Sequence, residues 1–128
     1  MWLFTKYGFF SVVSARADGA AKTKRIDPSK FMIRSRNREH LVNLMSDTDV
    51  GRLLDNPEII ETPDADYPYR IIVDRGRWIA AIAILVGMTM EDNFKKSVRT
   101  AMPDDQEFHK ALNTVWGVMR NYQQAVGE

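Results

Sequence analysis

Four residues near the middle of the chain could together bind an anionic group. Arg34 and Arg36 stand two residues apart in the apolar segment 31–36, so a strand there would place both side chains on one face. Tyr67 and Arg70 lie at the start of a second expected strand. Arginine pairs with carboxylates and phosphates through parallel hydrogen bonds, and both residue types are enriched at interface hot spots. We expect these residues to bind a protein partner or a small anionic ligand; in the alternative, the tyrosine only closes the core.

A second candidate for anion binding is Asn93 with Lys95, in the segment DNFK at 92–95. An asparagine amide and a lysine at the start of a short helix could converge on an anion. The alternative is a capped helix start, stabilised by ion pairs four residues apart such as Glu91 with Lys95. The spacing fits both hypotheses.

The polar segment 14–30 forms a basic arm and suggests a different partner, nucleic acid. It carries Lys22, Lys24 and Arg25 shortly before the strand with the two arginines. In this hypothesis the basic residues follow phosphates while aromatic side chains on a sheet face stack on bases. The aromatic candidates are Trp2, Phe4, Phe9 and Phe10. The alternative places the aromatics in the core and the charges in a solvated loop, which a pI of about 8.0 favours.

The motifs give no support for catalysis, a metal or a cofactor. The chain has no cysteine, which excludes a thiol nucleophile, a disulfide scaffold and a thiolate metal site. It also has no nucleophile elbow, phosphate-binding loop, dinucleotide fingerprint or zinc spacing. The segment from Asp47 to Asp55 is similar to a calcium loop, but Gly51 comes one position early, so a turn and a helix start are expected there. We therefore expect no catalytic residue, no metal site and no cofactor.

Strands and helices are expected to alternate irregularly along the chain. This pattern predicts the α+β class: a two-layer sandwich with a mostly antiparallel sheet, ferredoxin-like in outline, plus a C-terminal amphipathic helix. An acidic excursion without a long period is expected over 46–66. The expected strands are 2–13, 31–36, 69–73 and 88–90, and the expected helices start after Asn37, cover 77–86 and 91–100, and follow Pro103.

The last helix has the most regular apolar periodicity in the chain. Its apolar residues follow a spacing of three and four that is typical of an amphipathic helix. They are Phe108, Leu112, Val115, Met119 and Tyr122. Trp116 stands beside this complete stripe and requires a contact of its own, so we expect a homodimer formed through this helix or a sheet edge.

The composition is that of one ordinary globular domain, 1–128, with 45% hydrophobic and 27% charged residues. Charge is unevenly distributed, because residues 1–40 carry nine Lys/Arg against three acids and residues 41–70 carry two against seven. The apolar run 78–90 is about 13 residues long, short of the roughly 18–20 that span a bilayer. Together with the lack of cysteine, this favours a cytoplasmic protein without a membrane partner.

Three segments point to a family. The chain opens with MWLFTKYGFFSVV at 1–13 and continues with DYPYR at 66–70 and DNFK at 92–95. The set resembles a widespread family of small bacterial proteins of unknown function, whose members open with a nearly identical segment. The resemblance implies a single compact cytosolic domain, and it implies no activity, cofactor or catalytic residue.

Overall fold

The computed structural model describes residues 1–17 and 25–127. The chain divides into two compact units, Met1–Met90 and Glu91–Glu128, where the sequence predicts a single domain. The first unit contains the sheet with three helices, and the second contains two helices. The α+β class predicted from the sequence is confirmed.

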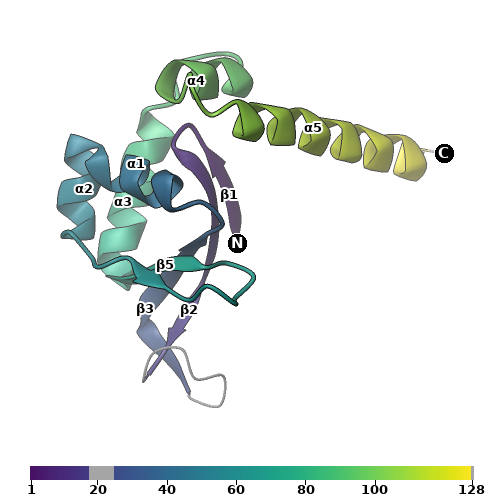
Figure 1. Ribbon diagram of the computed structural model, residues 1–128. Coiled ribbons are helices and arrows are strands. Elements are labelled where there is room, and N and C mark those ends of the chain that lie inside the picture. The colour runs from purple at the N-terminus through teal and green to yellow at the C-terminus, as the bar shows by residue number, and fades with distance from the viewer. Residues whose placement is uncertain (18–24, 128) are drawn as a thin grey trace. The chain divides into compact units, whose positions relative to one another are not determined.

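The sheet has five strands in the described part of the chain, and every pair of neighbours is antiparallel. Their order across the sheet is β1-β2-β3-β5-β4. Figure 1 labels β1, β2, β3 and β5. The strands are β1 (Trp2–Thr5), β2 (Gly8–Arg16), β3 (Ile26–Ser35), β4 (Ile60–Glu61) and β5 (Tyr69–Asp74).

The first strand predicted from the sequence is a hairpin instead. The chain reverses between β1 and β2, where the Thr5 hydroxyl donates to the carbonyl of Gly8 at 3.0 Å and accepts from the N–H of Tyr7 at 3.1 Å. Gly8 has φ +142°, a conformation that glycine adopts readily and other residues rarely do. The prediction of one strand over 2–13 is wrong. Apolar residues on both sides of the turn form an almost continuous run in the sequence, and this run gives no sign of the turn.

Two finer expectations about the sheet also differ from the structure. The element order of the first unit, β-β-β-α-α-β-β-α, departs from the β-α-β-β-α-β order of a ferredoxin-like fold. Residues 88–90 are not a strand, because Met88 caps the preceding helix with its N–H. The short edge strand is β4, in the acidic segment, and it pairs with β5.

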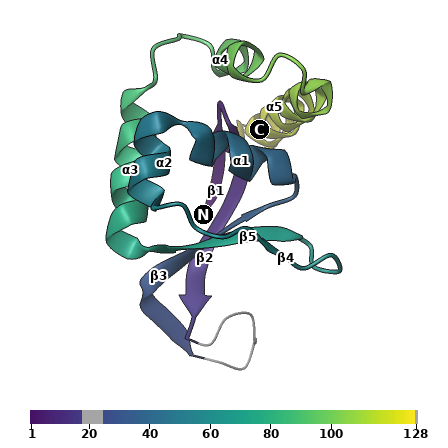
Figure 2. The ribbon, with the colours of Figure 1, turned by 60° about the vertical axis from the view of Figure 1, so that its left-hand side comes forward.

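Three helices cover one face of the sheet: α1 (Arg38–Ser46), α2 (Thr48–Leu54) and α3 (Arg75–Gly87) (Figure 2). Asn37 caps α1, as predicted, and its side chain accepts from the N–H of Glu39 at 3.0 Å. The strands and helices close one apolar core between them. Its fully buried members include Phe10, Ile33, Leu41, Leu44, Val50, Ile71 and Trp78.

Helix α2 lies inside the segment 46–66 that the sequence predicts to be extended. A helix of seven residues is too short to show a clear period, so only its cap was visible in the sequence. Asp47 is that cap: its Oδ1 accepts from the N–H groups of Asp49 and Val50 at 3.0 Å each. Its Oδ2 accepts from the Tyr7 hydroxyl at 2.6 Å, which ties the β1–β2 turn to α2. The predicted helix start at this position is confirmed.

Removal of this cap is expected to weaken the fold in a pH-dependent way. Burial raises the pKa of Asp47, but hydrogen bonds from Tyr7, Val50 and Asp49 outweigh it and hold that pKa below its usual value. Burial and the same bond to Asp47 raise the pKa of Tyr7 to about 12. Asp47→Ala should lower the free energy of unfolding by about 1–2 kcal/mol at pH 7, as measured by urea denaturation.

Because the folded pKa of Asp47 is depressed, its charge stabilises the fold above the unfolded pKa of about 4 and ceases to do so as pH falls through the folded pKa. The difference between wild type and Asp47→Ala should therefore shrink below about pH 4. Asp47→Asn is the matched control, because asparagine is also a good cap but carries no charge. A difference that stays constant from pH 7 to pH 3 would contradict this account.

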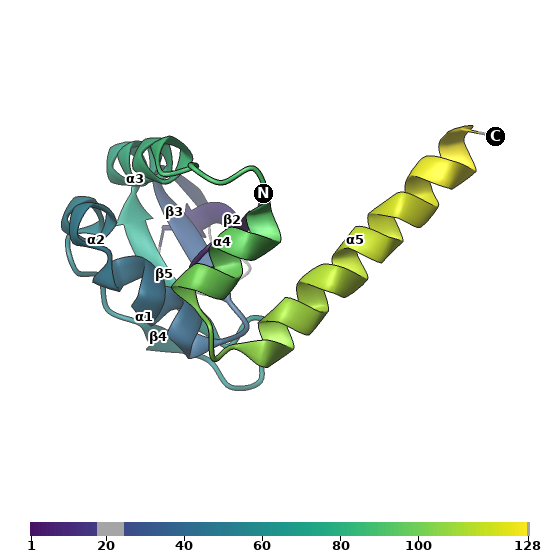
Figure 3. The ribbon, with the colours of Figure 1, turned by 90° about the horizontal axis from the view of Figure 1, so that it is seen from above.

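The second unit is a pair of helices, α4 (Phe94–Ala101) and α5 (Gln106–Gly127) (Figure 3). Both helices were predicted, although α4 begins three residues later than expected. The buried apolar residues described in this unit are Val98, Met102, Phe108 and Leu112. None of the described helices is both long and apolar enough to cross a membrane.

Candidate ligand-binding face of the sheet

The two faces of the sheet differ in chemistry. One face packs under α1, α2 and α3. On the other face, five residues in cross-strand register form one row across all five strands: Trp2, Ser11, Arg34, Arg70 and Ile60. The same register and the alternation of side chains add Phe4, Phe9, Val13, Met32 and Ile72 to this face. We call these ten residues the arginine face.

At the centre of the arginine face are two guanidinium groups on neighbouring strands. Arg34 donates from Nη2 to the Ser11 hydroxyl at 2.7 Å, and Arg70 donates from Nη2 to the Tyr67 carbonyl at 3.1 Å. The other donor contact of Arg70 is a weak one, from Nη1 to the sulfur of Met32 at 3.8 Å. The Nε atoms of both arginines are buried and have no hydrogen-bond partner.

Within residues 1–17 and 25–127, no carboxylate lies within 4.0 Å of either guanidinium. Arg70 is also 91% buried, since only 9% of its surface is exposed. Burial, and then the neighbouring charge of Arg34, lower the pKa of Arg70. A buried cation without a counter-ion is costly, so an anion bound here would remove an existing electrostatic penalty.

Tyr67 completes the cluster from the loop before β5. The guanidiniums of Arg34 and Arg36 lie 4.7 Å and 4.3 Å from the centre of its ring. Arg36 also donates to the carbonyl of Asp66 at 2.9 Å, which holds it beside the tyrosine. The structure thus brings together the four residues that the sequence singles out in this region.

Three aromatic side chains lie on the same face beside the arginines. The rings of Phe4 and Phe9 stack with centres 4.6 Å apart, and Trp2 meets Phe9 edge-on at 5.9 Å. Phe9 lies 6.5 Å from the Tyr67 ring, so the aromatic group is continuous with the arginine cluster. Trp2 is 69% exposed, whereas Phe10 points to the other face and is fully buried.

The remaining predicted site residues do not belong to this face. Asn93 caps α4, and its side-chain oxygen accepts from the N–H groups of Lys95 at 3.0 Å and Lys96 at 3.4 Å. Lys95 donates to Asn113 at 3.2 Å and lies 5.8 Å from the centre of the Trp116 ring. Both residues are in the second unit, and the cap matches the helix start that was the alternative to a site. The ion pair expected between Glu91 and Lys95 is not formed among the described residues, since Lys95 donates to Asn113 instead.

The predicted basic arm is only partly described. Lys22 and Lys24 lie outside the described residues. Arg25 is exposed, and its carbonyl accepts from the N–H of Ala17 at 2.8 Å. On both sides of this contact the chain is paired as β2 and β3 as far as Arg16 and Ile26, so the strands extend further into the segment 14–30 than expected.

Five members of the arginine face were not predicted from the sequence: Ser11, Val13, Met32, Ile60 and Ile72. The signal for Ser11 was a hydroxyl inside the apolar run FFSVV at 9–13, where a buried polar group requires a hydrogen-bond partner. Met32 carries no such signal. Among the described residues no group of three His, Asp or Glu side chains could hold a metal ion.

No protein-family model, curated protein or solved structure matches this chain. The resemblance to the small bacterial family therefore stays a prediction.

Proposed function

We propose that this protein is a small, non-catalytic binding module, and that the arginine face binds an anionic group between Arg34 and Arg70. The observation that carries the proposal is that the guanidiniums of Arg34 and Arg70 lie on neighbouring strands. Within residues 1–17 and 25–127, no carboxylate lies within 4.0 Å of either of them. Arginine recognises carboxylate and phosphate through charge-assisted hydrogen bonds, and each of these two guanidiniums has a buried Nε–H that no acceptor among the described residues satisfies. The lack of cysteine suits a reducing compartment, and we propose the cytoplasm as its location.

The aromatic residues beside the arginines favour a small ligand with two parts. Trp2, Phe4 and Phe9 offer a surface for a flat ring, and the arginines offer donors for an anionic group. A nucleoside monophosphate combines the two features and is a suitable probe. A protein partner would meet the same requirements with an aspartate or glutamate beside an aromatic residue.

The proposal is tested by calorimetric titration with adenosine monophosphate and with inorganic phosphate. The monophosphate should bind more tightly, because its ring stacks on the aromatic residues while phosphate contacts only the arginines. Arg34→Gln should weaken binding at least about 10-fold, since a hydrogen bond to a charged group is worth roughly 1.5–3 kcal/mol. Arg52→Gln is the matched control, because Arg52 is exposed on α2 and pairs with Asp49 at 3.3 Å. Absence of binding to both probes, or equal loss in the two variants, would reject a nucleotide-like ligand for this face.

A second candidate function is binding of single-stranded nucleic acid, which the exposed aromatic residues favour specifically. Bases stack on aromatic side chains of sheets, while nearby cations contact phosphates. A labelled oligonucleotide of about 12 nucleotides should then bind with an affinity that falls steeply with salt. Trp2→Ala should weaken this binding, as should neutralisation of Lys22, Lys24 and Arg25, whereas Trp116→Ala should not. Binding that is absent or independent of salt would remove this candidate.

A further inference from the structure

The C-terminal half of α5 carries an apolar stripe that is exposed. Met119, Tyr122 and Val126 repeat the spacing of the buried Phe108 and Leu112 at seven-residue intervals, as in a coiled coil, and Val118 lies beside them. Its exposed members are between 56% and 64% accessible: Val118, Met119, Tyr122 and Val126.

Helix α4 does not reach this stripe. The described contacts between α4 and α5 end at Asn113 and Trp116, which Lys95 meets through a hydrogen bond and a ring contact. From residue 118 to residue 127, every position around the helix is exposed. A helical segment of about ten residues is marginal in water without a packing partner. This segment also contains Gly127 and several other weak helix formers. Its helical structure therefore requires a packing contact to be stable.

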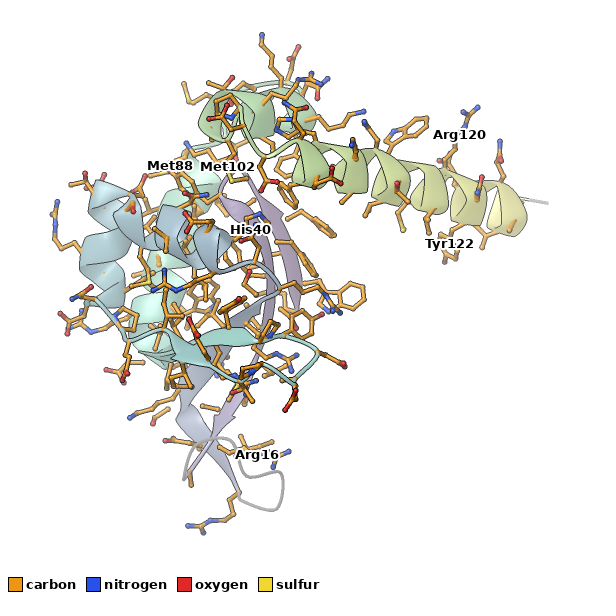
Figure 4. The ribbon with its side chains drawn as sticks, in the orientation of Figure 1. Arg16, His40, Met88, Met102, Arg120 and Tyr122 are labelled. Atoms are coloured by element: carbon orange, nitrogen blue, oxygen red, sulfur yellow. The ribbon has the colours of Figure 1, made fainter. Side chains whose placement is uncertain are left out.

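The charge pattern of α5 indicates which partner fits. Arg120 is the only charged residue between 111 and 127, although 27% of the whole chain is charged. Figure 4 shows Arg120 and Tyr122 projecting from opposite sides of α5, so the charge lies away from the stripe. An identical helix can therefore pack on the stripe without bringing like charges together. A partner with charged residues at its interface would meet no opposite charge on the stripe.

We propose that a second copy of this chain covers the stripe, with α5 packed against α5 across a two-fold axis. The stripe consists of a few side chains on one helix, so the interface should lie near or below the roughly 1,000 Å² of total buried area that a specific interface requires. The dimer should thus dissociate on dilution. Trp116 borders the stripe and would become partly covered as the two helices meet.

The experiment is sedimentation velocity of the full chain over a concentration series, with two variants that each add one negative charge. Met119→Glu places the charge on the stripe, and Gln124→Glu places it on the opposite side of the helix. Wild type and Gln124→Glu should move with increasing concentration from the 14.7 kDa monomer to twice that mass. Met119→Glu should remain a monomer throughout, and thermal unfolding recorded alongside should show that it is folded.

Two results would overturn the proposal. A wild-type monomer at every concentration would show that no second copy covers the stripe, and a loss of thermal stability in Met119→Glu would then indicate packing within one chain. A dimer that forms equally well in wild type and Met119→Glu would place the interface elsewhere.

Discussion

Gly8→Ala is expected to lower the free energy of unfolding by about 3 kcal/mol or more, which is a large effect for the addition of a single methyl group. Gly8 has φ +142°, where an alanine is strained. A Cβ added there would overlap the side chain of His40. His40 is buried in α1, and its Nδ1 accepts from the N–H of Phe9 at 3.3 Å, so the ring has little room to yield.

The measurement is urea denaturation of Gly8→Ala beside Gly76→Ala. A Cβ at Gly76, in the first turn of α3, meets no atom within 4 Å, and alanine is the better helix former. Gly76→Ala should therefore leave stability unchanged or raise it by up to about 1 kcal/mol. Equal stability of the two variants would show that the β1–β2 turn and α1 are not packed as described.

Arg70→Met is expected to affect binding and stability in opposite directions. Loss of the guanidinium should weaken binding of an anion at the arginine face by roughly 10- to 100-fold, because a hydrogen bond to a charged group is lost. The unliganded protein should become more stable by about 1 kcal/mol, since replacing a buried, unpaired charge with an apolar side chain often stabilises a fold. The lost bond to the Tyr67 carbonyl reduces this gain and does not reverse it.

This opposition distinguishes a binding residue from a structural one. If Arg70 served only to fix the Tyr67 loop, Arg70→Met would destabilise the protein and impair binding through misfolding. Arg52→Met is the control for a change of arginine to methionine, because Arg52 is exposed and should shift stability by less than about 0.5 kcal/mol. Urea denaturation without any phosphate in the buffer gives the unliganded values.

Local signals allowed most helices to be predicted from the sequence. Asn37 caps a helix at the expected place, and Asn93 caps one that begins three residues later than expected, because a cap acts on the next few residues only. The β1–β2 turn had no such signal. It uses Lys6 and Tyr7 with a glycine after them, in place of the asparagine–glycine or aspartate–glycine pair that usually marks a hairpin.

The candidate site was predictable in part for the same reason. The spacing of Arg34 and Arg36 placed them on one side of a strand, and both contact Tyr67. Their closeness to Arg70 depends on the pairing of β3 with β5, which joins residues 36 positions apart and leaves no local trace in the sequence. The exposure of Trp2 could not be predicted from the sequence either, because a row of aromatic residues in a strand is also typical of a buried core strand.

The most direct test of anion binding between Arg34 and Arg70 is thermal unfolding of wild type and Arg70→Met, with and without adenosine monophosphate. Without it, Arg70→Met should melt at the higher temperature. At a concentration about 100 times the wild-type dissociation constant, the ligand should stabilise wild type by about 2.7 kcal/mol and the variant much less, so that the order of the two melting temperatures reverses. An Arg70→Met variant that is the less stable protein in both conditions, with the same shift on addition of ligand, would contradict the account.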